Sequence, residues 1–138
     1  MKLSTIFAPL ALLPVIYAVN VSYDTVYDNA GQSLATVACS DGTNGLLTKG
    51  FTTFGSLPSF PRIGGAPAVT GWNSPACGTC WRLTYNGRSI NVLAIDVARG
   101  DFNIGLNAMN QLTNGQAVAL GRVPVDVAQI ANSGCGLR

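Results

Sequence analysis

Four cysteines constrain the fold of this chain more than any other feature of its sequence. They are Cys39, Cys77, Cys80 and Cys135. In an oxidising compartment an even number of cysteines favours disulfides, and two disulfides in 138 residues indicate a small, cross-linked domain. Four cysteines allow three pairings, and their positions alone do not choose among them.

The short spacing of Cys77 and Cys80 also occurs in redox motifs and in zinc sites. A thioredoxin-like redox motif is typical of cytosolic chains with a βαβ pattern, which this sequence lacks. A zinc site would need a second closely spaced pair, but Cys39 and Cys135 each stand alone. We therefore interpret the four cysteines as disulfide partners and predict neither a metal site nor a cofactor.

The first residues of the chain have the features of a secretory signal peptide. Residues 1–18 begin with a positively charged segment, continue with an apolar stretch and end at Ala18. The alternative is a membrane anchor, which requires about 20 apolar residues. The stretch is shorter than that and is interrupted by Pro9 and Pro14. We predict a signal peptide at 1–18, a mature domain at 19–138, and secretion without a membrane span.

The mature part shows no linker, repeat or second apolar span, so we expect one extracellular domain. Asn20-Val21-Ser22 is an N-glycosylation sequon close to the predicted cleavage point. Asn20 is therefore a candidate glycosylation site.

Short strands separated by turns dominate the expected secondary structure. Alternating and β-branched residues predict strands at 33–39, 81–85, 90–97, 117–120 and 123–127. Asn86-Gly87 predicts a hairpin turn, and Pro124 predicts an edge or bulged strand. A helix is expected from Leu106 to Asn114-Gly115. Residues 57–75, rich in Pro and Gly, predict a long irregular loop, and the whole pattern indicates a small, mostly β barrel.

Composition excludes several kinds of chemistry. The chain contains no histidine and no glutamate, which rules out serine–histidine triads and histidine acid–base catalysis within it. Its net charge is +2 without a basic run, which argues against nucleic acid as a partner. Carboxylate chemistry must come from aspartates, and these are Asp24, Asp28, Asp41, Asp96, Asp101 and Asp126.

Asp96 is the aspartate with the clearest functional signal. It follows the apolar run 92–95, where an aspartate is seldom a plain surface residue. The alternative is a buried carboxylate satisfied by backbone N–H groups or by arginine. Asp28 and Asp126 are expected to be ordinary solvated residues. Because no second aspartate stands out as a catalytic partner of Asp96, a binding groove fits better than a hydrolase pair.

Amide and aromatic side chains are further candidates for binding sugars. Asn side chains in or beside loops can both donate to and accept from hydroxyl and acetamide groups. Trp72 and Phe102 could contact sugar rings, although core packing explains such residues more often. Trp81 alternates with Leu83 and is expected in the core.

Several blocks of the mature chain resemble the cerato-platanin family of secreted fungal proteins. The most specific is the run Gly71-Trp72-Asn73-Ser74-Pro75-Ala76-Cys77-Gly78-Thr79-Cys80-Trp81. Further blocks are Val21-Ser22-Tyr23-Asp24, Cys39-Ser40-Asp41-Gly42, Phe102-Asn103-Ile104-Gly105-Leu106, Ala117-Val118-Ala119-Leu120-Gly121-Arg122-Val123 and Cys135-Gly136-Leu137. Together they extend over essentially the whole mature chain.

The resemblance implies a six-stranded double-ψ β-barrel of the expansin type, with one or two short helices. It implies the disulfides Cys39–Cys77 and Cys80–Cys135. It also implies a shallow groove for N-acetylglucosamine oligomers with Asp96 on its floor. The polar contacts carried over with it are Ser40, Asp41, Asn44 and Asn103, and Phe102 is carried over as a wall of the groove.

The sequence therefore predicts a secreted, non-catalytic protein that binds chitin-type oligosaccharides. The resemblance links such proteins to the fungal cell wall, to the elicitation of plant defence through a plant surface receptor, and to self-association at interfaces. Two alternatives remain: a surface-active coat protein, and a weak polysaccharide hydrolase or expansin-like wall loosener.

Overall fold

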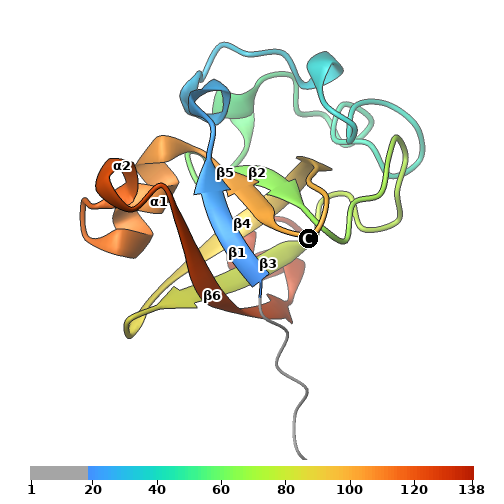
Figure 1. Cartoon of the computed structure of the whole chain (residues 1–138). Coiled ribbons are helices and arrows are strands. Elements are labelled where there is room, and N and C mark those ends of the chain that lie inside the picture. Colours follow the sequence, from blue (N-terminus) through green and yellow to red (C-terminus); the bar gives the residue numbers. More distant parts are fainter. Residues whose placement is uncertain (1–18) are drawn as a thin grey trace, which may run out of the picture.

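Six strands form a closed barrel in the computed structural model, which describes residues 19–138 (Figure 1). The strands are β1 (Val19–Tyr23), β2 (Ile63–Ala66), β3 (Cys80–Tyr85), β4 (Arg88–Val97), β5 (Phe102–Ile104) and β6 (Arg122–Ile130). They neighbour one another in the order β1-β5-β2-β4-β3-β6, and β6 closes the barrel onto β1. The predicted signal peptide lies outside the described residues.

The strand pairing is mixed. β1 runs parallel to β5 and β2 runs parallel to β4, while the other four pairs are antiparallel. Two short helices, α1 (Leu106–Thr113) and α2 (Ala117–Leu120), follow β5. This arrangement confirms the six-stranded double-ψ β-barrel. No helix within 19–138 is long and apolar enough to cross a membrane.

Elements with strong local signals formed as predicted. β3 and β4 make a hairpin around Asn86-Gly87, where both residues have positive φ, 47° and 78°. These angles are those of the turn that Asn-Gly favours. Helix α1 ends at Asn114 in the left-handed conformation, which is a common helix terminus.

Three of the predicted segments were wrong. Residues 33–39 contain a 3₁₀ turn at Leu34–Thr36, and residues 117–120 form helix α2. Both are short apolar stretches, in which periodicity does not separate strand from helix. The stretch 57–75, expected to be irregular throughout, contains β2, whose two central residues are glycines with low strand propensity.

At Pro124, strand β6 pairs with β1 but not with β3. The β6 register pairs Pro124 with Asn20 of β1, and pairing with β3 begins only at Asp126. Proline has no backbone N–H to donate, and this is tolerated where the strand is paired on one side only. Pro124 therefore lies at a local edge, as expected, although β6 as a whole closes the barrel.

Asp28 is not the ordinary solvated residue that the sequence suggested. Its Oδ2 accepts from the N–H of Leu106 at 2.8 Å, and its Oδ1 accepts from the N–H of Asn107 at 2.9 Å. These are the first N–H groups of α1, which have no partner within the helix. Asp28 therefore caps a helix that begins 78 residues later in the chain.

The two disulfides have the pairing that the resemblance implied. Cys39–Cys77 spans 5.4 Å between Cα atoms, and Cys80–Cys135 spans 5.7 Å. All four cysteines are buried. The first disulfide joins two of the loops that connect β1, β2 and β3, and Figure 1 shows this part of the chain, coloured blue to green, gathered over one end of the barrel. These loops carry three of the predicted site residues, Ser40, Asp41 and Asn44.

Candidate functional site

Asp96 lies near the end of β4 and is half-buried. Its Oδ1 accepts from the backbone N–H of Ala38 at 3.1 Å and from that of Val97 at 2.9 Å. Its Oδ2 accepts from the hydroxyl of Tyr27 at 3.0 Å. Since a carboxylate offers about four lone-pair sites, three are occupied by the protein and one region remains for another donor.

The buried Tyr27 holds this carboxylate in place through its hydroxyl group. It is 4% exposed and stacks on Phe54 with ring centroids 6.0 Å apart. Burial raises the pKa of the Tyr27 phenol well above its usual value, and the charge of Asp96, its hydrogen bond and the charge of Asp24 raise the pKa further. Tyr27 was missed at the sequence level because its segment has a polar, turn-like pattern.

The raised pKa of Tyr27 predicts a loss of stability at high pH. As pH rises above about 10, the unfolded chain releases this proton before the folded chain does. The stabilisation is therefore complete below about pH 10 and decreases above it. We expect the free energy of unfolding to fall by up to about 1.4 kcal/mol per pH unit from this group.

Urea unfolding between about pH 9 and about pH 11.5 checks this prediction. Tyr27→Phe should remove this part of the slope, whereas the half-buried Tyr85, changed to Phe, should leave it. An unchanged slope in Tyr27→Phe would contradict the assignment.

A row of polar residues crosses four strands on the outer face of the barrel. The strand registers pair Ser22 with Asn103, Asn103 with Gly65, and Gly65 with Asp96. Directly paired residues point to the same face of a sheet. Here that face is the outer one, because the neighbours of Asn103 in β5, Phe102 and Ile104, are buried in the core. We call Ser22, Asn103, Gly65 and Asp96 the polar row.

Asn103 and Asp96 lie on either side of Gly65 in the polar row, and the chain just after Asp96 packs closely over this glycine: an added Cβ at Gly65 would lie 2.8 Å from the carbonyl oxygen of Val97 and 2.9 Å from Cβ of Ala98. The Ser22 hydroxyl donates to Oδ1 of Asn103 at 3.2 Å, which fixes the amide orientation. Gly65 has no side chain, which permits this close approach of Val97 and Ala98 to β2. The predicted contacts Asn103 and Asp96 are thus brought together by strand register rather than by sequence proximity.

Asp24 is a second carboxylate in this neighbourhood. It is close enough to contribute to the raised pKa of Tyr27, and its Oδ1 accepts from the N–H of Val26 at 3.0 Å. That bond caps the 3₁₀ helix η3 (Thr25–Asp28). No feature of the sequence associates Asp24 with Asp96, so any test for catalysis must include both residues.

The other predicted contacts form a second group, where two loops meet. Oδ1 of Asp41 accepts from Nε1 of Trp72 at 2.6 Å, and the Ser40 hydroxyl donates to the same oxygen at 3.4 Å. The backbone N–H of Asn44 donates to Oδ1 of Asn73 at 2.9 Å, and its Nδ2 donates to the Asn73 carbonyl at 3.0 Å. We call these five residues the Trp72 loop cluster.

The two groups are connected by a short piece of chain. Ala38 donates to Asp96, and Asp41 lies three residues further on. The Cα atoms of Ala38 and Asp41 are therefore at most about 11 Å apart.

Phe102, Trp81 and Asn20 belong to neither of these two groups. Phe102 is 2% exposed and packs edge-on against Trp81 with ring centroids 5.9 Å apart, so its burial in the core does not fit the role of a groove wall. Trp81 is half-buried against the core, on the same strand face as the buried Leu83. Asn20, in β1, is half-buried, and its backbone N–H donates to Asp101; its glycosylation stays a prediction.

Comparison with known proteins identifies close relatives over nearly the whole described chain. The family model described as Cerato-platanin matches residues 19–137. Allergen Asp f 15 of Aspergillus fumigatus is 57% identical over 117 residues, which cover 85% of this chain and 76% of the allergen. Cerato-platanin 3 from M. perniciosa superimposes with a TM-score of 0.84 at 54% identity, covering 88% of this chain and all of that one.

More distant structures share the fold. The solution structure of the fungal elicitor Cerato-Platanin has a TM-score of 0.77 at 42% identity and covers 85% of this chain and 96% of its own. An expansin from Clavibacter michiganensis, solved as a mutant with cellohexaose, has a TM-score of 0.58 at 16% identity, with 84% of this chain matching half of the expansin. The expansin-like barrel, the two disulfides and the family match together show that this chain belongs to the cerato-platanin family.

Proposed function

We propose that this protein is a secreted, non-catalytic carbohydrate-binding protein whose ligands are chitin-type oligosaccharides. The polar row supplies the hydrogen bonds, and the oligosaccharide lies across β4, β2 and β5. We place the protein outside the fungal cell and at its wall, where such polymers occur.

The observation that carries this proposal is the half-buried Asp96 carboxylate, which the strand register aligns with the Asn103 amide on the outer face of the barrel. A carboxylate and an amide provide the acceptors and the donor that sugar hydroxyl and acetamide groups require. An open site of this kind should bind weakly, because each hydrogen bond contributes only about 0.5–1.5 kcal/mol net.

The bonding of Asp96 argues for binding rather than catalysis. A general acid must direct a proton at the glycosidic oxygen. Here Oδ1 serves two N–H groups and Oδ2 faces the Tyr27 hydroxyl. Asp24 is likewise used as a helix cap. Both carboxylates thus have structural partners of their own.

The related proteins are consistent with this function. The expansin with the same fold was solved with a cello-oligosaccharide, and a family member is described as a fungal elicitor. We extend the proposal to the elicitation of plant defence through recognition by a plant surface receptor.

Changing Asp96 to Asn tests the proposal directly. The new amide Oδ1 can still accept from Ala38 and Val97, and Nδ2 can donate to the Tyr27 oxygen, so the fold should be retained. We expect binding of chitin hexasaccharide, measured by calorimetry, to weaken about tenfold, because hydrogen bonds to a charged group are stronger than neutral ones.

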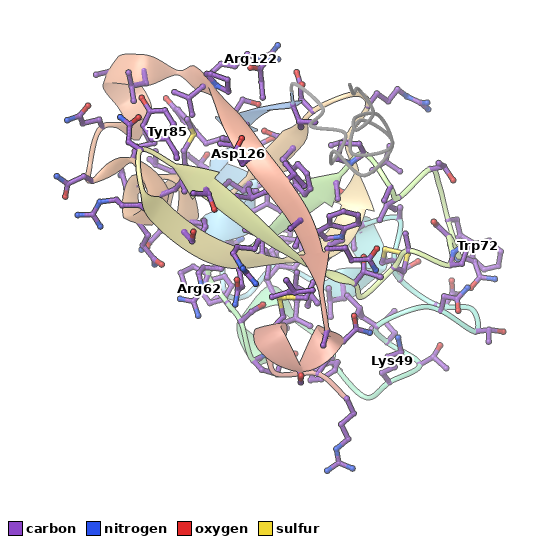
Figure 2. All side chains as sticks on the ribbon, turned by 90° about the horizontal axis from the view of Figure 1, so that it is seen from below. Lys49, Arg62, Trp72, Tyr85, Arg122 and Asp126 are labelled. Carbon is purple, nitrogen blue, oxygen red and sulfur yellow. A yellow bond between two sulfur atoms is a disulfide. The ribbon has the colours of Figure 1, made fainter. Side chains whose placement is uncertain are left out.

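The matched control is Asp126→Asn, since Asp126 is exposed on β6 (Figure 2), a strand that contributes no residue to the polar row. Equal affinities of the Asp96 variant and the wild type would refute the proposed site. Release of reducing ends from chitin or cellulose that is abolished by Asp96→Asn or Asp24→Asn would refute the non-catalytic assignment.

A surface-active coat protein is the second candidate function. Helix α2 exposes 67% of Val118 and 38% of Leu120, an apolar face on a secreted chain. If this face drives assembly, Val118→Ser should slow film formation at an air–water interface without affecting oligosaccharide affinity. Unchanged film formation would remove this candidate.

A further inference from the structure

Trp72 is an exposed aromatic residue whose side chain is held in place by a hydrogen bond. Its exposed fraction is 62%, and Figure 2 shows it at the margin of the molecule, on its own loop and away from Tyr85 and Asp126. Burial of the ring in the core does not explain its presence. An exposed indole that is held in one orientation offers a flat apolar face for contact with a ligand.

The Trp72 indole is held by its one polar atom. Nε1–H donates to Oδ1 of Asp41 at 2.6 Å, a hydrogen bond to a charged group. Because this bond uses the edge of the ring, it limits rotation of the indole and leaves a ring face free for contact.

The backbone beneath Trp72 is also held in place. Asn73 adopts a positive φ of 58° and is bonded twice by Asn44. At Gly42, also at positive φ, an added Cβ would lie 2.7 Å from Oδ1 of Asn73 and 3.0 Å from the Trp72 ring, so glycine is what permits this close approach. The Cys39–Cys77 disulfide ties together the two loops that meet here.

We propose that the indole face of Trp72 is a stacking platform for a pyranose ring of the bound oligosaccharide. The inference rests on the proposed function and extends the site from the polar row to the Trp72 loop cluster. It also changes the role of Asp41 and Asn44 from sugar contacts, as the sequence suggested, to positioning residues for Trp72 and Asn73.

The chemistry around Trp72 favours a saccharide as the occupant. The C–H face of a sugar ring carries partial positive charge and packs on the negative face of an aromatic ring. The neighbouring polar groups, a carboxylate, a hydroxyl and two amides, bond to one another, to the backbone and to the indole N–H, so the exposed ring face is the surface that they hold in place for the sugar. Since Trp72 and Asp96 belong to connected groups, a long oligomer should contact both and a disaccharide only one.

The test compares Trp72→Ala and Trp72→Phe with the wild type, using chitin hexasaccharide and disaccharide as probes. We expect Trp72→Ala to weaken hexasaccharide binding about tenfold and Trp72→Phe, which keeps an aromatic face, about threefold at most. Disaccharide bound at the polar row should be unaffected. The exposed position of Trp72 makes both variants compatible with folding, which a thermal melt would verify.

NMR separates failure of this inference from failure of the proposed function. In the wild type, hexasaccharide should shift the Trp72 indole N–H together with the backbone amides of Ala38 and Val97. Shifts at Ala38 and Val97 with an unmoved indole, or an unchanged affinity of Trp72→Ala, overturn the platform and leave the proposed function intact. Absence of shifts at both groups overturns the proposed function and the platform with it.

Discussion

Replacing Cys39 and Cys77 together with alanine should lower the free energy of unfolding by about 4 kcal/mol. The two cysteines are 38 residues apart and both are buried. In the chain-entropy description, a cross-link that closes a loop of this length removes about that much conformational freedom from the unfolded chain. A loss of this size is a large part of the total stability of a small domain, which is about 5–15 kcal/mol.

A thermal melt of the double variant checks this expectation, with a midpoint expected about 10–20 °C below that of the wild type. The matched comparison removes Cys80 and Cys135, which are 55 residues apart and should cost about as much. Only the first variant should also weaken hexasaccharide binding when folded, because its disulfide joins the loops around Trp72. A change in midpoint of less than about 3 °C in both variants would show that the barrel does not depend on its cross-links.

Gly64→Ala should destabilise the barrel by about 3 kcal/mol. Gly64 lies in β2, where an added Cβ would overlap the carbonyl oxygen of Asn103 and approach Cα of Ile104 to 2.7 Å. Both obstacles are backbone atoms of β5, so a side-chain rotation cannot relieve them. The strands must separate, which weakens the barrel and displaces Asn103 from the polar row.

Gly71→Ala is the control for this substitution, because an added Cβ at that position would have nothing within 4 Å. Urea unfolding should place Gly71→Ala within about 0.5 kcal/mol of the wild type. If Gly64→Ala lowers the free energy of unfolding as little as Gly71→Ala does, the close approach of β2 to β5 is contradicted.

The parts of the fold that the sequence predicted well are those determined by neighbouring residues. The β3–β4 hairpin depends on Asn86-Gly87, and the end of α1 depends on Asn114, so each turn carries its own signal. The cysteine pairing came from a family resemblance and not from the spacing of the residues. It was confirmed by the structure.

The parts that the sequence did not predict depend on distant contacts. Strand β2 is stabilised by pairing with β4 and β5 despite Gly64 and Gly65, which have low strand propensity. Asp28 caps α1 from the end of the 3₁₀ helix η3, and local sequence gives no sign of that contact. The four-residue helix α2 was expected to be a strand because so short a run carries no period.

The candidate site shows the same division. Asp96 could be chosen from sequence because an aspartate directly after a buried apolar run is unusual. Its alignment with Asn103 requires the strand register, and its bond to Tyr27 requires a fold that brings together residues 69 positions apart. The exposure of Trp72 was equally hidden, since core packing explains a tryptophan in such a sequence more often than a binding surface does.

Titration of isotope-labelled protein with chitin hexasaccharide tests the central claim most directly. The informative signals are the backbone amides of Ala38 and Val97, which donate to Oδ1 of Asp96, and the side-chain amide of Asn103. The account predicts that these signals shift and saturate at high micromolar to millimolar ligand, and that Asp96→Asn weakens the effect. If they stay unmoved at millimolar ligand, the polar row does not bind chitin-type sugars, and the function proposed for this protein is contradicted.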